Sequence, residues 1–298
     1  MKHTKLLSFI IIFGLYTLNS CNSSSKKEDT KTLTVTIEPQ KYFLDRIAGN
    51  HFKVECIVPS GANPESADFT PSQMMSLDKS IAYFKIGYLG IENTLIDKVT
   101  SNNKEIKVVD CSQGITPIGE PCAHDHHDAD HQHHGHAGGD PHIWSSVTSA
   151  KIMAGNMYNA LLEIDPVNKE DYSRNFNELN AEINTTDSII KSYLQKTPAK
   201  AFIIYHPALS YFAEEYGLTQ YSIEHEGKKP SPSQLKSLID KAREENIKVV
   251  FIQQEFDKKN AETIAGAIGG KTVPLNLLSY DWNDEMIKVA KALALENE

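Results

Sequence analysis

Three short polar stretches contain the side chains best suited to binding a metal ion. The stretch Pro59–Ser66 leaves an apolar run and contains Glu65, and the sequence Asp-Pro-His-Ile-Trp contains His142. His206 follows another apolar run and precedes a proline. Imidazole and carboxylate groups are common ligands of transition metals in proteins. Because a lone histidine at the end of a strand is usually structural, each stretch alone is weak evidence for such a site.

A low-complexity segment between Cys111 and Asp140 holds more imidazoles. It contains seven of the twelve histidines: His124, His126, His127, His131, His133, His134 and His136. Many ligand pairs compete in such a tract and ordering it costs entropy, so we expect loose metal binding. The alternative is a loop that only raises solubility. His225, between two glutamates, is an auxiliary ligand or a solvated loop histidine.

Cysteine spacing excludes other kinds of site. The four cysteines are Cys21, Cys56, Cys111 and Cys122, and none forms a CxxC pair. A thiolate zinc knuckle and a thioredoxin-type site are therefore excluded. Cys111 and Cys122 are close enough in sequence to close a small disulfide loop under oxidising conditions, and whether they pair stays open.

Composition limits the class of protein. The chain has 298 residues, 40% of them hydrophobic, which is too apolar for a disordered chain and allows one large domain or two ordinary ones. Its 39 acidic and 30 basic residues give a net charge of −9. No attraction to nucleic acid or to an anionic membrane surface is expected from this charge.

The N-terminus predicts export. Two lysines precede the apolar run Leu6–Leu18, which is too short to span a bilayer comfortably. The run ends in Leu-Asn-Ser-Cys21, which resembles a bacterial lipoprotein signal with Cys21 as the lipidated residue; the alternative is an ordinary signal peptide. We expect a signal peptide over residues 1–20, a flexible tether over 21–31, and a protein anchored by lipid in the periplasm or cell envelope.

The rest of the chain predicts two α/β halves. Short runs rich in Val, Ile, Phe and Tyr are typical of buried parallel strands. In the first half they are Leu33–Ile37, Lys53–Val58, Ile81–Ile86 and Ile106–Val109. In the second half they are Ala201–Tyr205, Leu218–Ile223, Lys248–Ile252 and Lys271–Pro274. Helical segments alternate with these runs, so we expect two lobes, each a parallel sheet flanked by helices.

One long helix is expected between the halves. Apolar residues recur there at helical steps: Tyr172, Phe176, Leu179, Ile183, Ile190 and Leu194. Pro166 suits a first turn. We therefore assign residues 32–165 to an N-terminal lobe that includes the His-rich loop 122–138, residues 166–196 to the linker helix and residues 197–298 to a C-terminal lobe.

Several motifs occur in the order in which one known family has them. They are Gly-Ala-Asn-Pro-Glu-Ser, Tyr-Leu-Gly-Ile-Glu, the His-rich insertion, Asp-Pro-His-Ile-Trp, Tyr-His-Pro-Ala and Phe-Ile-Gln-Gln-Glu-Phe. This ordered set resembles the metal-binding lipoproteins of zinc and manganese ABC importers, the ZnuA-like group, over essentially the whole mature chain. The resemblance implies a monomeric solute-binding protein with a transition metal between two lobes that a rigid helix joins. It also implies docking on a membrane permease powered by a cytoplasmic ATPase.

The resemblance also implies ligands. The family's second and third histidines fall on His142 and His206, and its first histidine position holds Glu65. A late position that is often aspartate holds Asn276, a second departure. Glu65, His142 and His206 are thus the expected ligands. The fourth place is open between water, Asn276, Asp281 and a residue of Gln253–Glu255.

Zinc is the expected metal. Two imidazoles and a carboxylate suit tetrahedral Zn²⁺, and zinc generally binds such groups more tightly than Mn²⁺ does. A carboxylate in place of an imidazole nevertheless shifts the preference of the site toward harder ions such as Mn²⁺, so Mn²⁺ stays the alternative metal.

Two other functions stay open. One is a secreted zinc-dependent hydrolase, although the chain has no HExxH sequence and Glu65, already used as a ligand, leaves no clear general base. The other is a surface adhesin, a role attributed to some proteins of this group. Turnover of a substrate by the zinc-loaded protein in a screen would favour the hydrolase. Loss of cell adhesion while growth under metal limitation stays normal would favour the adhesin.

Overall fold

The computed structural model describes residues 31–119, 139–197, 199–224 and 227–295. From Lys31 onward the chain forms one compact unit that contains two lobes. Cys21, Cys122, the seven histidines of the loop and His225 lie outside the described residues. No helix among the described residues is long and apolar enough to cross a membrane.

The N-terminal lobe is a parallel sheet with helices. Its strands are β1 (Thr32–Val35), β2 (Lys53–Cys56), β3 (Ala82–Lys85) and β4 (Lys107–Asp110), in the order β2-β1-β3-β4. Its helices are α1 (Glu38–Ala48), the short η1 (Gly49–His51), α2 (Pro71–Asp78) and α3 (Gly90–Asn102). Thr70 and Gln73 form a capping box that fixes the start of α2, because each side chain satisfies a backbone N–H of the other residue.

The C-terminal lobe repeats this topology. Its strands are β5 (Ala201–Ile204), β6 (Thr219–Ser222), β7 (Val249–Gln253) and β8 (Lys271–Leu275), in the order β6-β5-β7-β8. Its helices are α6 (Ser210–Glu215), α7 (Pro232–Glu244), α8 (Lys259–Ile268) and α9 (Trp282–Leu293). All pairings in both sheets are parallel, so the expected fold class is confirmed.

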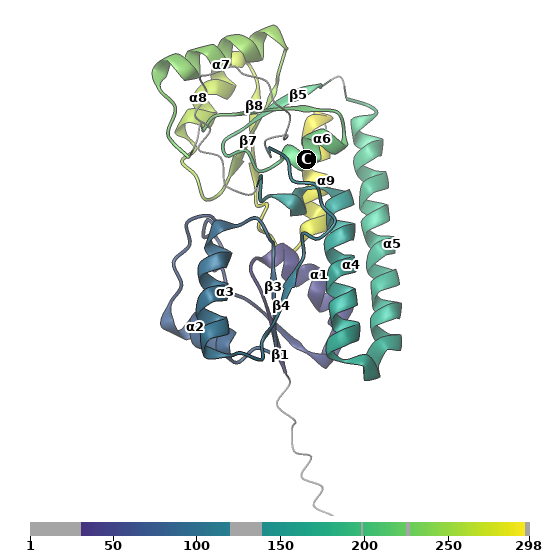
Figure 1. Cartoon of the computed structure of the whole chain (residues 1–298). Helices are drawn as coiled ribbons and strands as arrows, with labels where there is room; N and C mark the ends of the chain where they lie inside the picture. The colour runs from purple at the N-terminus through teal and green to yellow at the C-terminus, as the bar shows by residue number, and fades with distance from the viewer. Residues whose placement is uncertain (1–30, 120–138, 198, 225–226, 296–298) are drawn as a thin grey trace, which may run out of the picture. The chain divides into compact units, whose positions relative to one another are not determined.

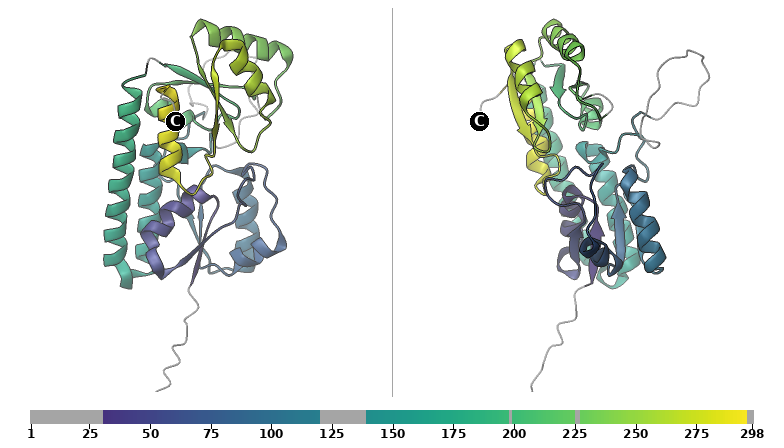
Figure 2. Two further views of the ribbon diagram at one scale, coloured as in Figure 1. Left: turned by 180° about the vertical axis from the view of Figure 1, so that it is seen from behind. Right: turned by 90° about the vertical axis from the view of Figure 1, so that its left-hand side faces the viewer.

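Two long helices lie beside the sheets. The expected linker helix is α5 (Lys169–Leu194), preceded by the short η3 (Pro166–Asn168). The sequence analysis did not predict its neighbour α4 (Val147–Ile164), which follows the short η2 (Ile143–Ser145). Figures 1 and 2 show α4 and α5 side by side, with α5 extending beside both lobes. Because α5 packs against α1, α4 and α9, it holds elements of both halves together.

The larger of two hydrophobic cores extends through both lobes. It contains Leu33 and Phe84 of the first sheet together with Phe202 and Phe251 of the second. Alternate residues of the second sheet, such as Ile203 and Val250, enter a smaller cluster on the other face. Successive strand side chains point to opposite faces, so β5 and β7 are buried on both.

The two tryptophans connect the lobes. The indole Nε1 of Trp144, in η2, donates to the carbonyl oxygen of Leu277 at 2.8 Å. The Nε1 of Trp282, in α9, donates back to the carbonyl oxygen of Trp144 at 2.6 Å. Both rings are buried, and buried indole N–H groups need such partners. The segment that carries His142 is thereby fixed to the loop between β8 and α9.

Candidate metal site

Three side chains from both lobes converge on one point. The Nε2 atoms of His142 and His206 are 3.2 Å apart. The Oε1 atom of Glu65 is 3.7 Å from the first and 3.6 Å from the second. These are the three residues expected as ligands, and each offers one ligand atom within 4.8 Å of the others. The group has the size of a metal coordination shell.

Glu65 lies in the loop that leaves β2. Tight turns shape this loop, since the backbone N–H of Ala62 donates to Pro59 and that of Ser66 donates to Asn63. The Oδ1 atom of Asn63 also accepts the backbone N–H of Glu65 at 2.8 Å. Asparagine favours such turns because its side chain replaces a backbone partner. The carboxylate is 18% exposed, so it is largely removed from water.

His142 is held by Asp140, two residues earlier. The Oδ1 atom of Asp140 lies 2.7 Å from Nδ1 of His142 and also accepts its backbone N–H at 2.9 Å. The hydroxyl of Tyr211 donates to the carbonyl oxygen of Asp140 at 2.7 Å, which ties this segment to α6. Burial alone would raise the pKa of Asp140, but its hydrogen bonds with His142 hold it below the usual value.

His206 follows β5 by two residues. Its Nδ1 atom lies 3.3 Å from Oε1 of Glu224, and the ring of Phe256 stacks on its imidazole with ring centres 5.3 Å apart. Gln253 fixes the backbone by donating to the carbonyl oxygen of His206 at 2.7 Å and accepting its N–H at 3.3 Å. Burial alone would lower the pKa of His206, but Glu224 and Glu65 raise it to about 9.

Asp140 and Glu224 are the functional residues that the sequence analysis did not assign. Each carboxylate contacts the Nδ1 atom of a histidine whose Nε2 faces the centre of the group. Such outer carboxylates orient metal-binding imidazoles and make them better ligands. The place of Glu224 in the sequence could have indicated its role, because Glu224 lies two residues after β6 just as His206 lies two residues after β5.

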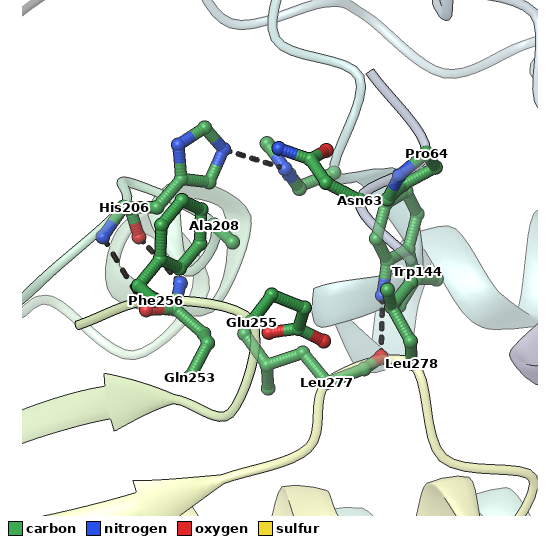
Figure 3. A pocket seen from close by; sticks show the side chains of 11 residues that line it. Asn63, Pro64, Trp144, His206, Ala208, Gln253, Glu255, Phe256, Leu277 and Leu278 are labelled. Carbon is green, nitrogen blue, oxygen red and sulfur yellow. Dashed lines mark hydrogen bonds between the residues drawn. The ribbon is translucent and has the colours of Figure 1, made fainter. Parts of the chain in front are cut away.

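A cavity adjoins the two histidines. Its lining includes Trp144, Gln253, Glu255, Phe256 and Leu277. Figure 3 shows these side chains around a common space, with His206 at its upper side. Burial raises the pKa of Glu255, and the nearby charge of His206 opposes that change. Most of the lining is apolar, which limits the access of water to a bound ion.

The two other candidates for the fourth ligand lie outside the group of three. Asn276 directly follows β8, its backbone N–H donates to Glu285 at 3.0 Å, and its Oδ1 is buried without a partner among the described residues. Asp281 is exposed at the start of α9. Asp281 does not belong to the group of His, Cys, Asp and Glu ligand atoms that the structure brings within 4.8 Å.

The cysteines do not contribute to this group. Among the described residues Cys56 and Cys111 form no disulfide, and neither belongs to the group formed by Glu65 and the two histidines. Burial raises the pKa of both thiols far above the usual value, so they stay protonated. A protonated buried thiol is a poor metal ligand.

The donor set fits a divalent transition metal. Two imidazole nitrogens and one carboxylate oxygen are three of the four ligands of a tetrahedral site. The candidate ligands come from both lobes and their imidazoles contact outer carboxylates, an arrangement that suits a two-lobed protein with a metal site between its lobes.

Comparison with known proteins identifies the family. The model "ZnuA: Zinc-uptake complex component A periplasmic" matches residues 33–294. The chain therefore belongs to the ZnuA family, the periplasmic metal-binding proteins of ABC metal importers.

Individual relatives agree with this assignment. The high-affinity zinc uptake system protein ZnuA of Bacillus subtilis (strain 168) is 29% identical over 274 residues, which are 91% of this chain and 85% of the relative. The manganese ABC transporter substrate-binding lipoprotein PsaA of Streptococcus pneumoniae is 24% identical over 86% of this chain and 82% of its own. A crystal structure of ZnuA is 35% identical, covers 91% of this chain and 100% of its own, and has a TM-score of 0.81. Relatives named for zinc and for manganese thus both occur.

Proposed function

We propose that this protein binds one Zn²⁺ ion as cargo through Glu65, His142 and His206 and delivers it to an ABC permease. The observation that supports the proposal most directly is the pair of Nε2 atoms 3.2 Å apart, with Glu65 completing the group. Two imidazoles favour zinc over manganese, which prefers oxygen ligands. A solved ZnuA deletion mutant with zinc bound, 36% identical with a TM-score of 0.79, is consistent with this cargo.

The remaining features complete the proposal. Cys21 carries the lipid anchor, so the monomeric protein stays at the membrane outside the cytoplasm, close to its permease. The His-rich loop, residues 122–138, binds zinc weakly and raises its concentration near the cleft. The relatives that it matches are named as transport components, which supports a binding protein rather than a hydrolase.

Deletion of residues 122–138 tests the division between loop and cleft. We expect the shortened chain to keep one tightly bound zinc after dialysis, because Glu65, His142 and His206 all lie outside the deleted segment. Metal analysis and calorimetry measure this, with the full chain as control. The full chain should show additional weak sites that the shortened chain lacks. A shortened chain that does not bind zinc tightly would contradict the proposal. If it retains manganese more tightly than zinc, the transported metal is manganese.

Zinc binding should release a proton from His206. Since the pKa of His206 is raised to about 9, the imidazole is charged at neutral pH, and the metal must displace its Nε2 proton. We therefore expect zinc affinity to rise with pH up to about pH 9. Calorimetry at pH 7.5 in buffers of different ionisation enthalpy counts the released protons. Glu224→Gln removes a group that raises this pKa and should lower the count, whereas equal counts would contradict this account.

A further inference from the structure

Glu255 is a half-buried carboxylate beside the site, and it is not one of the three expected ligands. It follows β7 by two residues and lines the cavity that His142 and His206 also line. Its Oε1 atom is buried and has no hydrogen-bond partner within the described parts of the chain. Figure 3 shows the carboxylate between Phe256 on one side and Leu278 on the other. A buried acceptor without a partner is costly, so this position favours a ligand that supplies positive charge.

The residues on both sides of Glu255, Gln253 and Phe256, contact His206 through their side chains. Gln253 forms two hydrogen bonds with the backbone of His206, and the ring of Phe256 stacks on its imidazole. Glu255 lies between these two residues, so its backbone has a fixed place next to a metal ligand. Its carboxylate is not among the groups within 4.8 Å, but a glutamate side chain has three rotatable bonds with which to move.

A second acceptor without a partner lies at the same sheet edge. Gln253 pairs with Leu275 across β7 and β8, so Glu255 and Asn276 both follow the ends of these neighbouring strands. The Oδ1 atom of Asn276 is also buried and without a partner among the described residues. Glu255 differs from Asn276 in lining the cavity and in carrying charge. One carboxylate leaves a bound divalent ion with one net positive charge, and a second neutralises it, which favours binding where water is excluded.

We propose that Glu255 is the fourth protein ligand of the metal and that rotation of its side chain brings a carboxylate oxygen to the ion held by Glu65, His142 and His206. This inference rests on the proposed function. It gives the site two nitrogen and two oxygen ligands, with one carboxylate from each lobe. The fourth ligand, which the sequence left open, then comes from the loop that follows β7.

The experiment compares Glu255→Gln with Asp257→Asn in the full chain. Both variants change a carboxylate to an amide within the same loop, but Asp257 is exposed and accepts a hydrogen bond from the backbone of Lys259. Zinc affinity is measured by competition with a chelator, and the Co²⁺ absorption spectrum reports the number and type of ligands. We expect Glu255→Gln to weaken zinc binding by at least about 10–100-fold, the range found for outer-shell partners, and to alter the Co²⁺ spectrum. Asp257→Asn should change neither.

The outcomes separate this inference from the proposed function. Wild-type zinc affinity and an unchanged Co²⁺ spectrum in Glu255→Gln would overturn the inference, and a loss confined to Asn276→Ala would assign the fourth place to Asn276. Metal-free Glu255→Gln should unfold at the wild-type temperature or above, which excludes a folding defect as the cause of weaker binding. If His206→Ala loses zinc while Glu255→Gln does not, only this inference fails. If His206→Ala binds zinc normally, the proposed site itself fails.

Discussion

His206→Ala should weaken zinc binding in the cleft by more than about 100-fold, since loss of an outer hydrogen-bond partner alone costs about 10–100-fold. The substitution removes an imidazole whose Nε2 lies 3.2 Å from that of His142 and 3.6 Å from Glu65. It also leaves Glu224 without the imidazole that it contacts. Chelator competition on a chain that lacks residues 122–138 measures the cleft without a contribution from the loop.

His51→Ala is the matched control. His51 makes a comparable contact with a carboxylate, since its Nε2 lies 3.0 Å from Asp171, but it belongs to η1 and is absent from the metal-ligating group. We expect wild-type zinc affinity in this variant. Equal affinities in the two variants would show that the convergent histidines do not bind the ion.

Trp282→Ala should lower the free energy of unfolding by about 3–5 kcal/mol, the usual cost of deleting a large buried aromatic side chain. The ring is 1% exposed, packs edge to face on Phe43 at 5.2 Å between ring centres, and donates to Trp144. Because one core contains residues of both lobes, we expect a single unfolding transition in wild type and variant alike. Urea titration followed by circular dichroism and by tryptophan fluorescence measures both quantities.

Val167→Ala is the control for this effect. Val167 is 84% exposed in η3, and substitutions at such surface positions usually change stability by less than about 0.5 kcal/mol. Two separate transitions in the wild type would contradict the shared core, because they would mean that each lobe unfolds alone. If Trp282→Ala is as stable as Val167→Ala, the buried indole of Trp282 does not stabilise the fold as expected.

Much of the fold could be predicted because its signals are local. Each expected strand overlaps an observed strand, since buried parallel strands are short apolar runs between polar turns. The missed helix α4 also had a signal, with Val147, Ala150, Met157 and Leu161 at helical steps and buried in the core. Alanine and methionine make this apolar stripe less conspicuous than that of α5.

The site was predictable only in part. Glu65, His142 and His206 stand in recognisable motifs, and the structure brings them together. The contacts of Asp140 and Glu224 with the imidazoles depend on ring orientation, which sequence does not encode. Likewise, the position of Glu255 beside His206 depends on β5 and β7 being neighbours in the sheet. A polar residue follows the end of each of the four strands in the C-terminal lobe, and only the fold shows which of these residues meet.

Glu65, His142 and His206 differ in how firmly the protein holds them, and this difference sets the order in which they release the ion. His142 and His206 are each attached through backbone and ring contacts on several sides. Glu65 lies far from either end of the irregular stretch between β2 and α2, whereas η2 begins directly after His142 and β5 ends two residues before His206. Departure of the cargo should therefore begin at Glu65, whose movement opens the coordination sphere while both imidazoles stay in place. A permease that displaces this one segment would unload the protein without separating the lobes.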